Sequence, residues 1–248
     1  VFKMKITAIF LAFVVSFGLL MLPSCDRVSN PYPPVVNLEL DTTLYPGNWS
    51  DYVANEWPTF TQNTNTDRNI LIEDFTGHKC IFCPAAADLA HQLHEANPNR
   101  VYVASIHAGV DGIGDFQTVD AEYPLDFTNP DGLAIGTWFG LNDGGFIGNP
   151  RGPVSRVSNG GVIFQSPGQW SSMTSTLLTA NDLKVNMQAA LNYYPATKGA
   201  FLHVEAEKLD QTLTNELGIV AYLLEDSLVG DQKMSDNSHN QSYIHRDI

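Results

Sequence analysis

The sequence predicts an α/β fold, and two observations lead to this prediction. Residues 69–107 contain, in order, a short apolar run, a turn with two cysteines, a helical pattern and a second apolar run. Two short strands joined by a helix are typical of a right-handed crossover between parallel neighbours. The composition of the 248-residue chain, 44% hydrophobic and 16% charged, is that of a globular protein with a hydrophobic core.

The charge balance and the missing motifs exclude several classes of function. Lys and Arg total 13 against 27 Asp and Glu, which gives a net charge of −14. Nucleic-acid affinity depends on cations that neutralise phosphates, so we expect no nucleic-acid partner. The sequence has no nucleophile elbow, phosphate loop, dinucleotide fingerprint or HExxH motif. Hydrolase, kinase and nicotinamide-enzyme functions therefore gain no support, and we expect no cofactor.

The first 24 residues are expected to form a signal peptide for export. Lys3 and Lys5 precede an apolar run over 6–22, which is short for a membrane-spanning helix. Leu-Pro-Ser-Cys25 resembles the bacterial lipobox, and this resemblance implies that Cys25 is lipidated and attaches the protein to a membrane. The alternative is a signal anchor that is never cleaved, with Cys25 as an ordinary thiol.

The segment 25–67 is expected to form an extended tether. It is rich in Asn, Pro, Thr and Ser, and residues 30–34 favour polyproline conformation. Residues 35–40 alternate between apolar and polar side chains and could add an edge strand.

The two remaining cysteines lie between a strand and a helix. Residues 69–75 are apolar and β-branched, which predicts a buried strand, and 101–107 predict a second one. A turn leads from the first strand to Cys80 and Cys83. The helix is expected over 84–96, because Pro84 suits a first helical position and Asn-Pro follows Ala96.

This position gives the cysteine pair a possible redox chemistry. Cys80 and Cys83 are three residues apart at a helix start, so they can close a small disulfide ring. The free N–H groups and partial positive charge of the helix N-terminus favour the thiolate, as would Lys79 and His78. Cys80 would attack a substrate disulfide and Cys83 would resolve the mixed disulfide. The alternative is an inert disulfide that holds the turn in an oxidising compartment.

The cysteine segment resembles the thioredoxin superfamily. Asp74 and Phe75 precede Cys80 by six and five residues, as the Asp-Phe pair of thioredoxins does. The resemblance implies that Asp74 is buried beneath the cysteines and moves protons during exchange. It also implies a cis-proline that faces the cysteines and opens the next strand. Pro150 is the candidate and Pro153 the second choice.

Further motifs narrow the resemblance. They are Phe-Thr-Gly-His-Lys-Cys-x-x-Cys-Pro84, Pro-x-Gly-x-Val-Ser-Arg156, and the segments 222–229 and 243–246. Together they resemble the thioredoxin-like lipoproteins of Bacteroidetes-type bacteria that are named after a 28-kDa outer membrane protein. This family implies an exported lipoprotein of the outer membrane, in the cell envelope. In related sequences further strands follow the last of these motifs.

The resemblance implies a thioredoxin-like fold followed by a partial, sandwich-like β-rich segment. The thioredoxin-like domain is expected over 68–194 and the β-rich region over 195–248. An inserted loop and helix region is expected at about 109–149, with a helix at 133–139. Helical pattern over 169–192 and apolar runs at 200–206 and 217–225 predict a further helix and two strands.

Two functions from different classes remain. The first is a thiol–disulfide oxidoreductase that acts on exported protein thiols and disulfides through Cys80, Cys83, Asp74 and Pro150. The second is a binding or adhesion lipoprotein with a structural disulfide and an unknown surface ligand. A copper or zinc site that joins His78 or His107 to both thiols is a third, weaker idea. We expect no metal, because the Cys-x2-Cys-x7-His-x2-His spacing matches no familiar zinc module.

Overall fold

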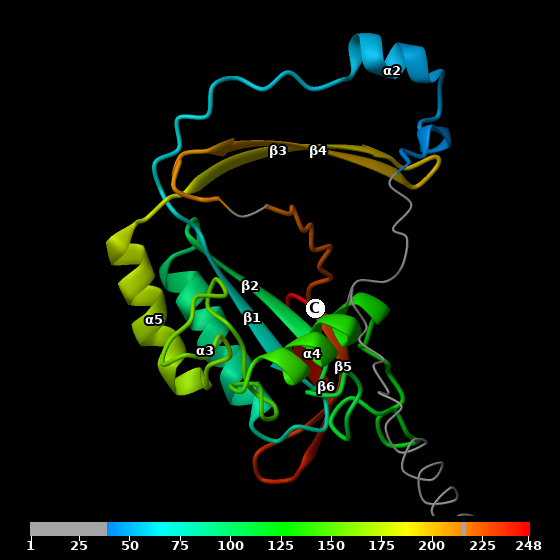
Figure 1. Cartoon of the computed structure of the whole chain (residues 1–248). Helices are drawn as coiled ribbons and strands as arrows, with labels where there is room; N and C mark the ends of the chain where they lie inside the picture. Colours follow the sequence, from blue (N-terminus) through cyan, green and yellow to red (C-terminus); the bar gives the residue numbers. More distant parts are fainter. Residues whose placement is uncertain (1–38, 215–216) are drawn as a thin grey trace, which may run out of the picture. The chain divides into compact units, whose positions relative to one another are not determined.

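The structure, a computed structural model, describes residues 39–214 and 217–248. These residues form a mixed α/β arrangement with four α-helices and three two-stranded sheets (Figure 1). In chain order the elements are η1 (Thr42–Leu44), α2 (Trp49–Asn55), β1 (Ile70–Thr76), α3 (Cys83–Ala96), β2 (Val101–His107), α4 (Pro130–Asn142), α5 (Pro167–Ala180), β3 (Val185–Tyr194), β4 (Gly199–Lys208), β5 (Leu228–Lys233) and β6 (His239–His245). The expected signal peptide, Cys25 and most of the possible strand at 35–40 lie outside the described residues.

Strands β1 and β2 form the parallel pair that the sequence predicts. Their register runs from Ile70 opposite Val101 to Thr76 opposite His107. Helix α3 connects them and packs against both strands. The predicted order of strand, cysteine turn, helix and parallel strand is therefore confirmed.

A short antiparallel segment, residues 151–154, lies along the other edge of β1. The Phe75 N–H donates to the Arg151 carbonyl at 2.9 Å, and the Glu73 N–H donates to the Pro153 carbonyl at 3.1 Å. Gly152 pairs in turn with Gln165. Gly152 is required here, because a Cβ at this position would lie 1.7 Å from the Glu73 carbonyl oxygen. The strand order is thus β2, β1, 151–154 and then the residues around 165.

The alternation of β1 side chains produces two cores. Ile70 and Ile72 face α3 and α5, which lie next to each other beside the strands (Figure 1), and Trp170 of α5 is fully buried in this cluster. Phe75 faces the opposite way and packs with aromatic rings of α4 and the loops around it. Because helices cover both faces of the parallel pair, β1 is buried along nearly its whole length rather than at alternate positions.

The helix predicted over 169–192 is wrong in its second half. Helix α5 ends at Ala180, and Asn181 has a left-handed backbone with φ of 47°. Residues 185–194 instead form β3, which pairs antiparallel with β4 from Val185 opposite Lys208 to Tyr194 opposite Gly199. The burial of β3 alternates as a half-covered strand requires. Residues 194 and 195, between which the sequence predicts a domain boundary, lie where β3 ends and the turn of this hairpin begins.

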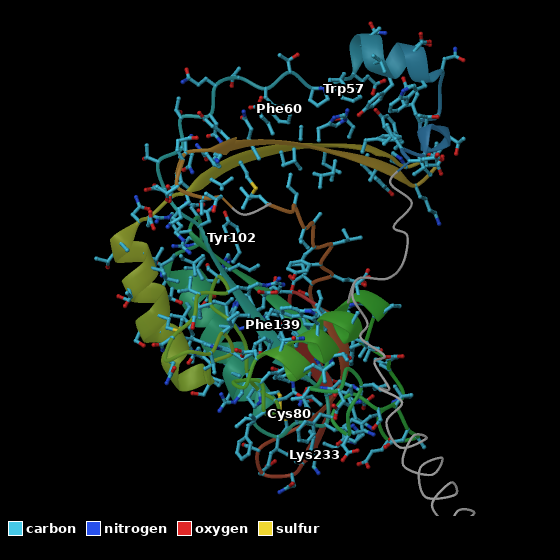
Figure 2. All side chains as sticks on the ribbon, in the orientation of Figure 1. Trp57, Phe60, Cys80, Tyr102, Phe139 and Lys233 are labelled. Carbon is cyan, nitrogen blue, oxygen red and sulfur yellow. A yellow bond between two sulfur atoms is a disulfide. The ribbon has the colours of Figure 1, made fainter. Side chains whose placement is uncertain are left out.

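The extended tether predicted over 25–67 is wrong for residues 42–55, which form η1 and α2. This segment covers the β3–β4 hairpin with aromatic rings. Tyr52 is fully buried, and its hydroxyl pairs with the His203 imidazole of β4. Trp57, labelled over the hairpin in Figure 2, packs edge-on against His203 with ring centroids 4.6 Å apart. Burial of the Tyr52 ring explains why a polar segment folds back instead of extending.

The C-terminal residues form the third sheet, a hairpin in which β5 and β6 pair antiparallel with an irregularity between Gly230 and Gln232. The strand predicted at 217–225 is wrong, since these residues form no strand. The helix predicted at 133–139 is confirmed within the longer α4. Among the described helices, none combines the length and apolar character that crossing a membrane requires.

Candidate functional site

The two cysteines form a disulfide at the start of α3. The Cα atoms of Cys80 and Cys83 are 5.4 Å apart. Local hydrogen bonds shape the turn, because the Cys80 N–H donates to the Gly77 carbonyl at 3.0 Å and the Cys83 N–H to the Cys80 carbonyl at 3.3 Å. Helix α3 begins at Cys83 with Pro84 in its first turn. The disulfide therefore lies where the helix N-terminus would stabilise a thiolate once it is reduced.

The disulfide is buried, which differs from the open position expected for an attacking Cys80. Both cysteines are only 1% exposed, whereas Phe82 between them is 65% exposed. Strand β5 lies against the turn, as the labels of Cys80 and Lys233 in Figure 2 indicate. The Gln232 amide donates to the Cys80 carbonyl at 3.1 Å, and the Lys233 N–H donates to the His78 carbonyl at 2.8 Å. The β5–β6 hairpin thus holds the cysteine turn from outside.

Asp74 lies on β1, the strand that leads to the cysteine turn. Its carboxyl is fully buried, and neither oxygen has a hydrogen-bond partner in the described protein. Burial raises the pKa of Asp74 from its ordinary value of 3.8 to about 7. A carboxyl group with such a pKa can take up or release a proton near neutral pH.

Asp74 and Cys83 line the same small cavity, which has a volume of about 30 Å³. The rest of its wall comes from α3, β2, β5 and β6, and includes His107, Gln232 and His245. Cys83 and the buried carboxyl are therefore joined by a space whose wall contains both polar and apolar side chains.

Three buried histidines surround Phe127 next to this cavity. The ring centroid of Phe127 lies 5.9 Å from that of His78, 5.0 Å from that of His107 and 4.3 Å from that of His245. Burial lowers the pKa of His78, lowers that of His107 well below the ordinary value, and lowers that of His245 to about 4. These imidazoles are therefore neutral at pH 7.

The neighbouring charges assist a thiolate less than the sequence suggests. Lys79 forms an ion pair with Asp120 at 2.7 Å and lies over the Tyr123 ring, 5.5 Å from its centroid. His78 is neutral, and its Nε2 pairs with the Thr118 carbonyl at 3.0 Å. Within the described residues, no three or more His, Cys, Asp or Glu side chains are arranged to hold a metal ion. This includes His78 and His107, the two candidates that the sequence offers.

Pro150 begins the segment that pairs with β1, and the Asn149–Pro150 peptide bond is cis. Asn149 fixes this turn, because its side-chain amide donates to the Ala108 carbonyl at 2.9 Å. The buried Gln117 amide donates to the Thr76 carbonyl at 2.6 Å and to the Asn149 side-chain oxygen at 3.2 Å. Gln117 thus connects the proline turn to the end of β1 that leads to the cysteines. Pro153, the second choice, lies inside the paired segment.

The sequence did not predict an ion pair between Glu73, the neighbour of Asp74 in β1, and Arg156, whose side chain is 41% exposed. Glu73 is fully buried, and Arg156 donates to both of its carboxylate oxygens, at 2.8 and 2.7 Å. The Tyr222 hydroxyl donates to the same carboxylate at 2.8 Å. Arg156 and Tyr222 both occur in the motifs of the family resemblance, but the resemblance assigns neither of them a role. The available signal was a glutamate inside an apolar strand, because such a residue must find a partner when it is buried.

Comparison with family models, with curated proteins and with solved structures finds no match to this chain. The geometry of the site itself therefore carries the argument for function.

Proposed function

We propose that this protein is a thiol–disulfide oxidoreductase of the thioredoxin type, with Cys80 and Cys83 as its redox pair. The observation that carries the proposal is the Asp74 carboxyl, which is buried without a partner and lines the same cavity as Cys83. Burying an unpartnered carboxyl group is unfavourable by several kcal/mol. Selection for stability alone would favour an apolar residue there, so a chemical role explains its presence.

The arrangement around the cysteines supports a thioredoxin-like fold. The disulfide follows β1 at the N-terminus of α3, and β2 runs parallel to β1. The segment after Pro150 then pairs antiparallel with the other edge of β1, and α5 packs beside α3. Thioredoxin-like proteins use this order of elements to bring the cysteines, a buried aspartate and a cis-proline together.

In the proposed reaction the reduced protein transfers two electrons to a substrate disulfide. The Cys80 thiolate attacks one substrate sulfur, the substrate S–S bond breaks, and the leaving thiolate takes a proton from water. Asp74 accepts the proton of the Cys83 thiol, and the Cys83 thiolate attacks the Cys80 sulfur. The Cys80–Cys83 bond forms, the mixed disulfide breaks, and the second substrate thiolate accepts the proton that Asp74 took from Cys83, which restores the carboxylate. The structure corresponds to the oxidised product, and the reverse sequence oxidises a dithiol substrate.

Substrate access requires a movement. Because Cys80 is almost fully buried and Gln232 of β5 binds its carbonyl, the β5–β6 hairpin must shift before a protein thiol or disulfide reaches the sulfur. Protein disulfides and thiols of the exported compartment are the proposed substrates.

The same burial favours a second candidate function, a binding or adhesion protein whose disulfide is structural. An enclosed disulfide under a bound hairpin resists small thiols, as an inert crosslink does. In this case the buried, unpartnered Asp74 carboxyl would destabilise the fold without serving any function, and for this reason we favour the first proposal.

The two candidates are separated by redox assays on the full chain. Reduction of insulin by dithiothreitol is followed with wild-type protein, Cys80→Ser and Asp74→Asn. We expect catalysis by the wild type, none by Cys80→Ser, and a reduction of 10²-fold or more for Asp74→Asn at pH 7, the usual effect of losing a general base. Wild-type activity no greater than that of Cys80→Ser would refute the oxidoreductase proposal. Under the structural alternative, dithiothreitol reduces the disulfide only when the protein unfolds.

We also propose that the protein is exported and held in the outer membrane by a lipid on Cys25. The support is the sequence alone, namely the basic start, the apolar run and the lipobox-like Leu-Pro-Ser-Cys25. Labelled palmitate is expected to be incorporated by the wild-type protein and not by Cys25→Ala. Equal labelling of both would contradict lipidation at this cysteine.

A further inference from the structure

The cavity lined by Cys83 and Asp74 contains more unpartnered polar atoms than the reaction above uses. Neither oxygen of Asp74, nor Nδ1 of His107, nor Nε2 of His245 has a hydrogen-bond partner in the described protein. All three side chains are buried, and all three line the same cavity. They come from three different elements, β1, β2 and β6. Buried polar groups in folded proteins are nearly always satisfied, so this concentration points to a shared partner.

The size and the walls of the cavity fit one kind of partner. A volume of about 30 Å³ exceeds the 10–15 Å³ or so that one water requires. A buried water needs two to four polar neighbours, and the cavity offers a carboxyl group and two imidazoles. The ring centroids of His107 and His245 are 5.7 Å apart, which leaves room for a water between polar atoms that do not touch directly.

We propose that His107 and His245 are positioning residues of the redox site, which hold a buried water against the Asp74 carboxyl. A neutral imidazole has one nitrogen that accepts a hydrogen bond and one that donates. The water can therefore donate one hydrogen to Asp74 and the other to one imidazole, while its oxygen accepts the N–H of the other imidazole. The Asp74 carboxylate then receives a hydrogen bond in a site that otherwise gives it none. The inference rests on the proposed function in one respect, namely that Asp74 accepts the proton of the Cys83 thiol.

The water counteracts the desolvation of Asp74. Without a donor the charged carboxylate is unfavourable at this depth, and burial alone raises the pKa of Asp74 to about 7. A hydrogen bond from the water favours the charged form, so a larger share of the group is ionised, and able to accept a proton, at the pH at which thiols exchange. The C-terminal strand β6, through His245, would thus belong to the redox site although it follows the cysteines by some 160 residues, as their numbering shows.

Other titratable groups face the same site. The cavity wall also carries His91 from α3 and Tyr243, Arg246 and Asp247 from β6 and the residues after it. Asp231 acts on His245 through its charge, and His78 does so when it is protonated. Burial alone dominates the pKa of Asp74, so replacing a polar wall residue by an apolar one shifts that pKa upward.

The test measures the ionisation of Asp74 directly in the oxidised full chain. Aspartate carboxyl groups are labelled with ¹³C, the Asp74 signal is assigned with Asp74→Asn, and its titration is followed by NMR. We expect His245→Leu and His107→Leu each to raise the Asp74 midpoint by about one pH unit or more. His245→Gln keeps a polar group in the wall and is expected to remain closer to the wild type. His94→Leu is the matched control, since the His94 ring already pairs with the Val101 carbonyl at 2.7 Å and does not line the cavity.

An unchanged midpoint in both leucine variants, or an equal shift in His245→Gln and His245→Leu, would overturn the inference. A measurement on the wild type alone guards against variants that fail to fold. Cross-relaxation is expected between a long-lived water and the imidazole C–H protons of His107 or His245, and its absence would also overturn the inference. Because the protein stays oxidised, these outcomes do not depend on catalysis. If the midpoint shifts but the protein does not catalyse insulin reduction, the water site stands and the proposed function is refuted. If the protein catalyses insulin reduction but the midpoint does not shift, the proposed function stands and the water site is refuted.

Discussion

Replacing Asp74 by asparagine is expected to change how stability depends on pH. The folded protein holds the proton of Asp74 up to about pH 7, whereas the unfolded chain releases it near 3.8. Between these values the folded state binds more protons, so raising the pH favours unfolding. The difference of about 3 in pKa corresponds to about 4 kcal/mol at 1.36 kcal/mol each, and Asp74 is fully buried, so solvent screening does not reduce it.

The free energy of unfolding is measured by urea denaturation of the oxidised protein at pH values from 4 to 8. The stability of Asp74→Asn minus that of the wild type is expected to rise by up to about 4 kcal/mol over this range. Taking the difference cancels the constant cost of burying an amide and the titration of other groups. Asp88→Asn, an exposed change on α3, is the control. A difference that stays constant within about 1 kcal/mol for Asp74→Asn would refute the reasoning, because desolvation of this carboxyl is its only premise.

Three further predictions concern the surroundings of the site. Arg156→Met leaves the Glu73 carboxylate buried without its cation and is expected to destabilise the protein by about 3–5 kcal/mol in urea denaturation, and a loss below about 1 kcal/mol would contradict this. Gln232→Ala removes the donor to the Cys80 carbonyl and is expected to speed reduction by dithiothreitol about fivefold, the equivalent of one hydrogen bond, whereas an unchanged rate would show that this contact does not control access. Burial lowers the pKa of His245 to about 4, so the free energy of unfolding of the wild type is expected to fall by up to about 3 kcal/mol as the pH falls from 6.5 to 4. In urea denaturation over the same pH range, His245→Gln is expected to lose less stability than the wild type.

The part of the fold that could be predicted is the part with local signals. Strands β1 and β2 follow from apolar runs, and Pro84 and Asn97 mark the ends of α3. The end of α5 was missed because Met187 and Leu191 are four residues apart. That spacing places two side chains on one face of a helix, but it also places them on one face of a strand. The local sequence cannot separate the two, and pairing with β4 decides for the strand.

The same limit applies to the candidate site. The site residues Cys80, Cys83 and Asp74 are close in sequence, so the local motif was sufficient to predict that they belong to one site. Their cover comes from Gln232 and His245, which reach the site through tertiary packing alone. The burial of the disulfide could therefore not be predicted from the cysteine motif. This burial is the reason why the proposed reaction requires a movement of the β5–β6 hairpin.

The aromatic cover over the β3–β4 hairpin has a consequence for the order of folding. Tyr52 pairs with His203 across 151 positions, and the Asn192 amide donates to Tyr52 across 140. A chain that emerges from its N-terminus presents Trp49 and Tyr52 long before the strands they cover exist, while β1, α3 and β2 are complete by residue 107. Contacts of such large separation form slowly, because a long loop must close first. The cysteine-bearing unit can thus assemble while these rings are still in solvent, and the hairpin cover closes among the last steps.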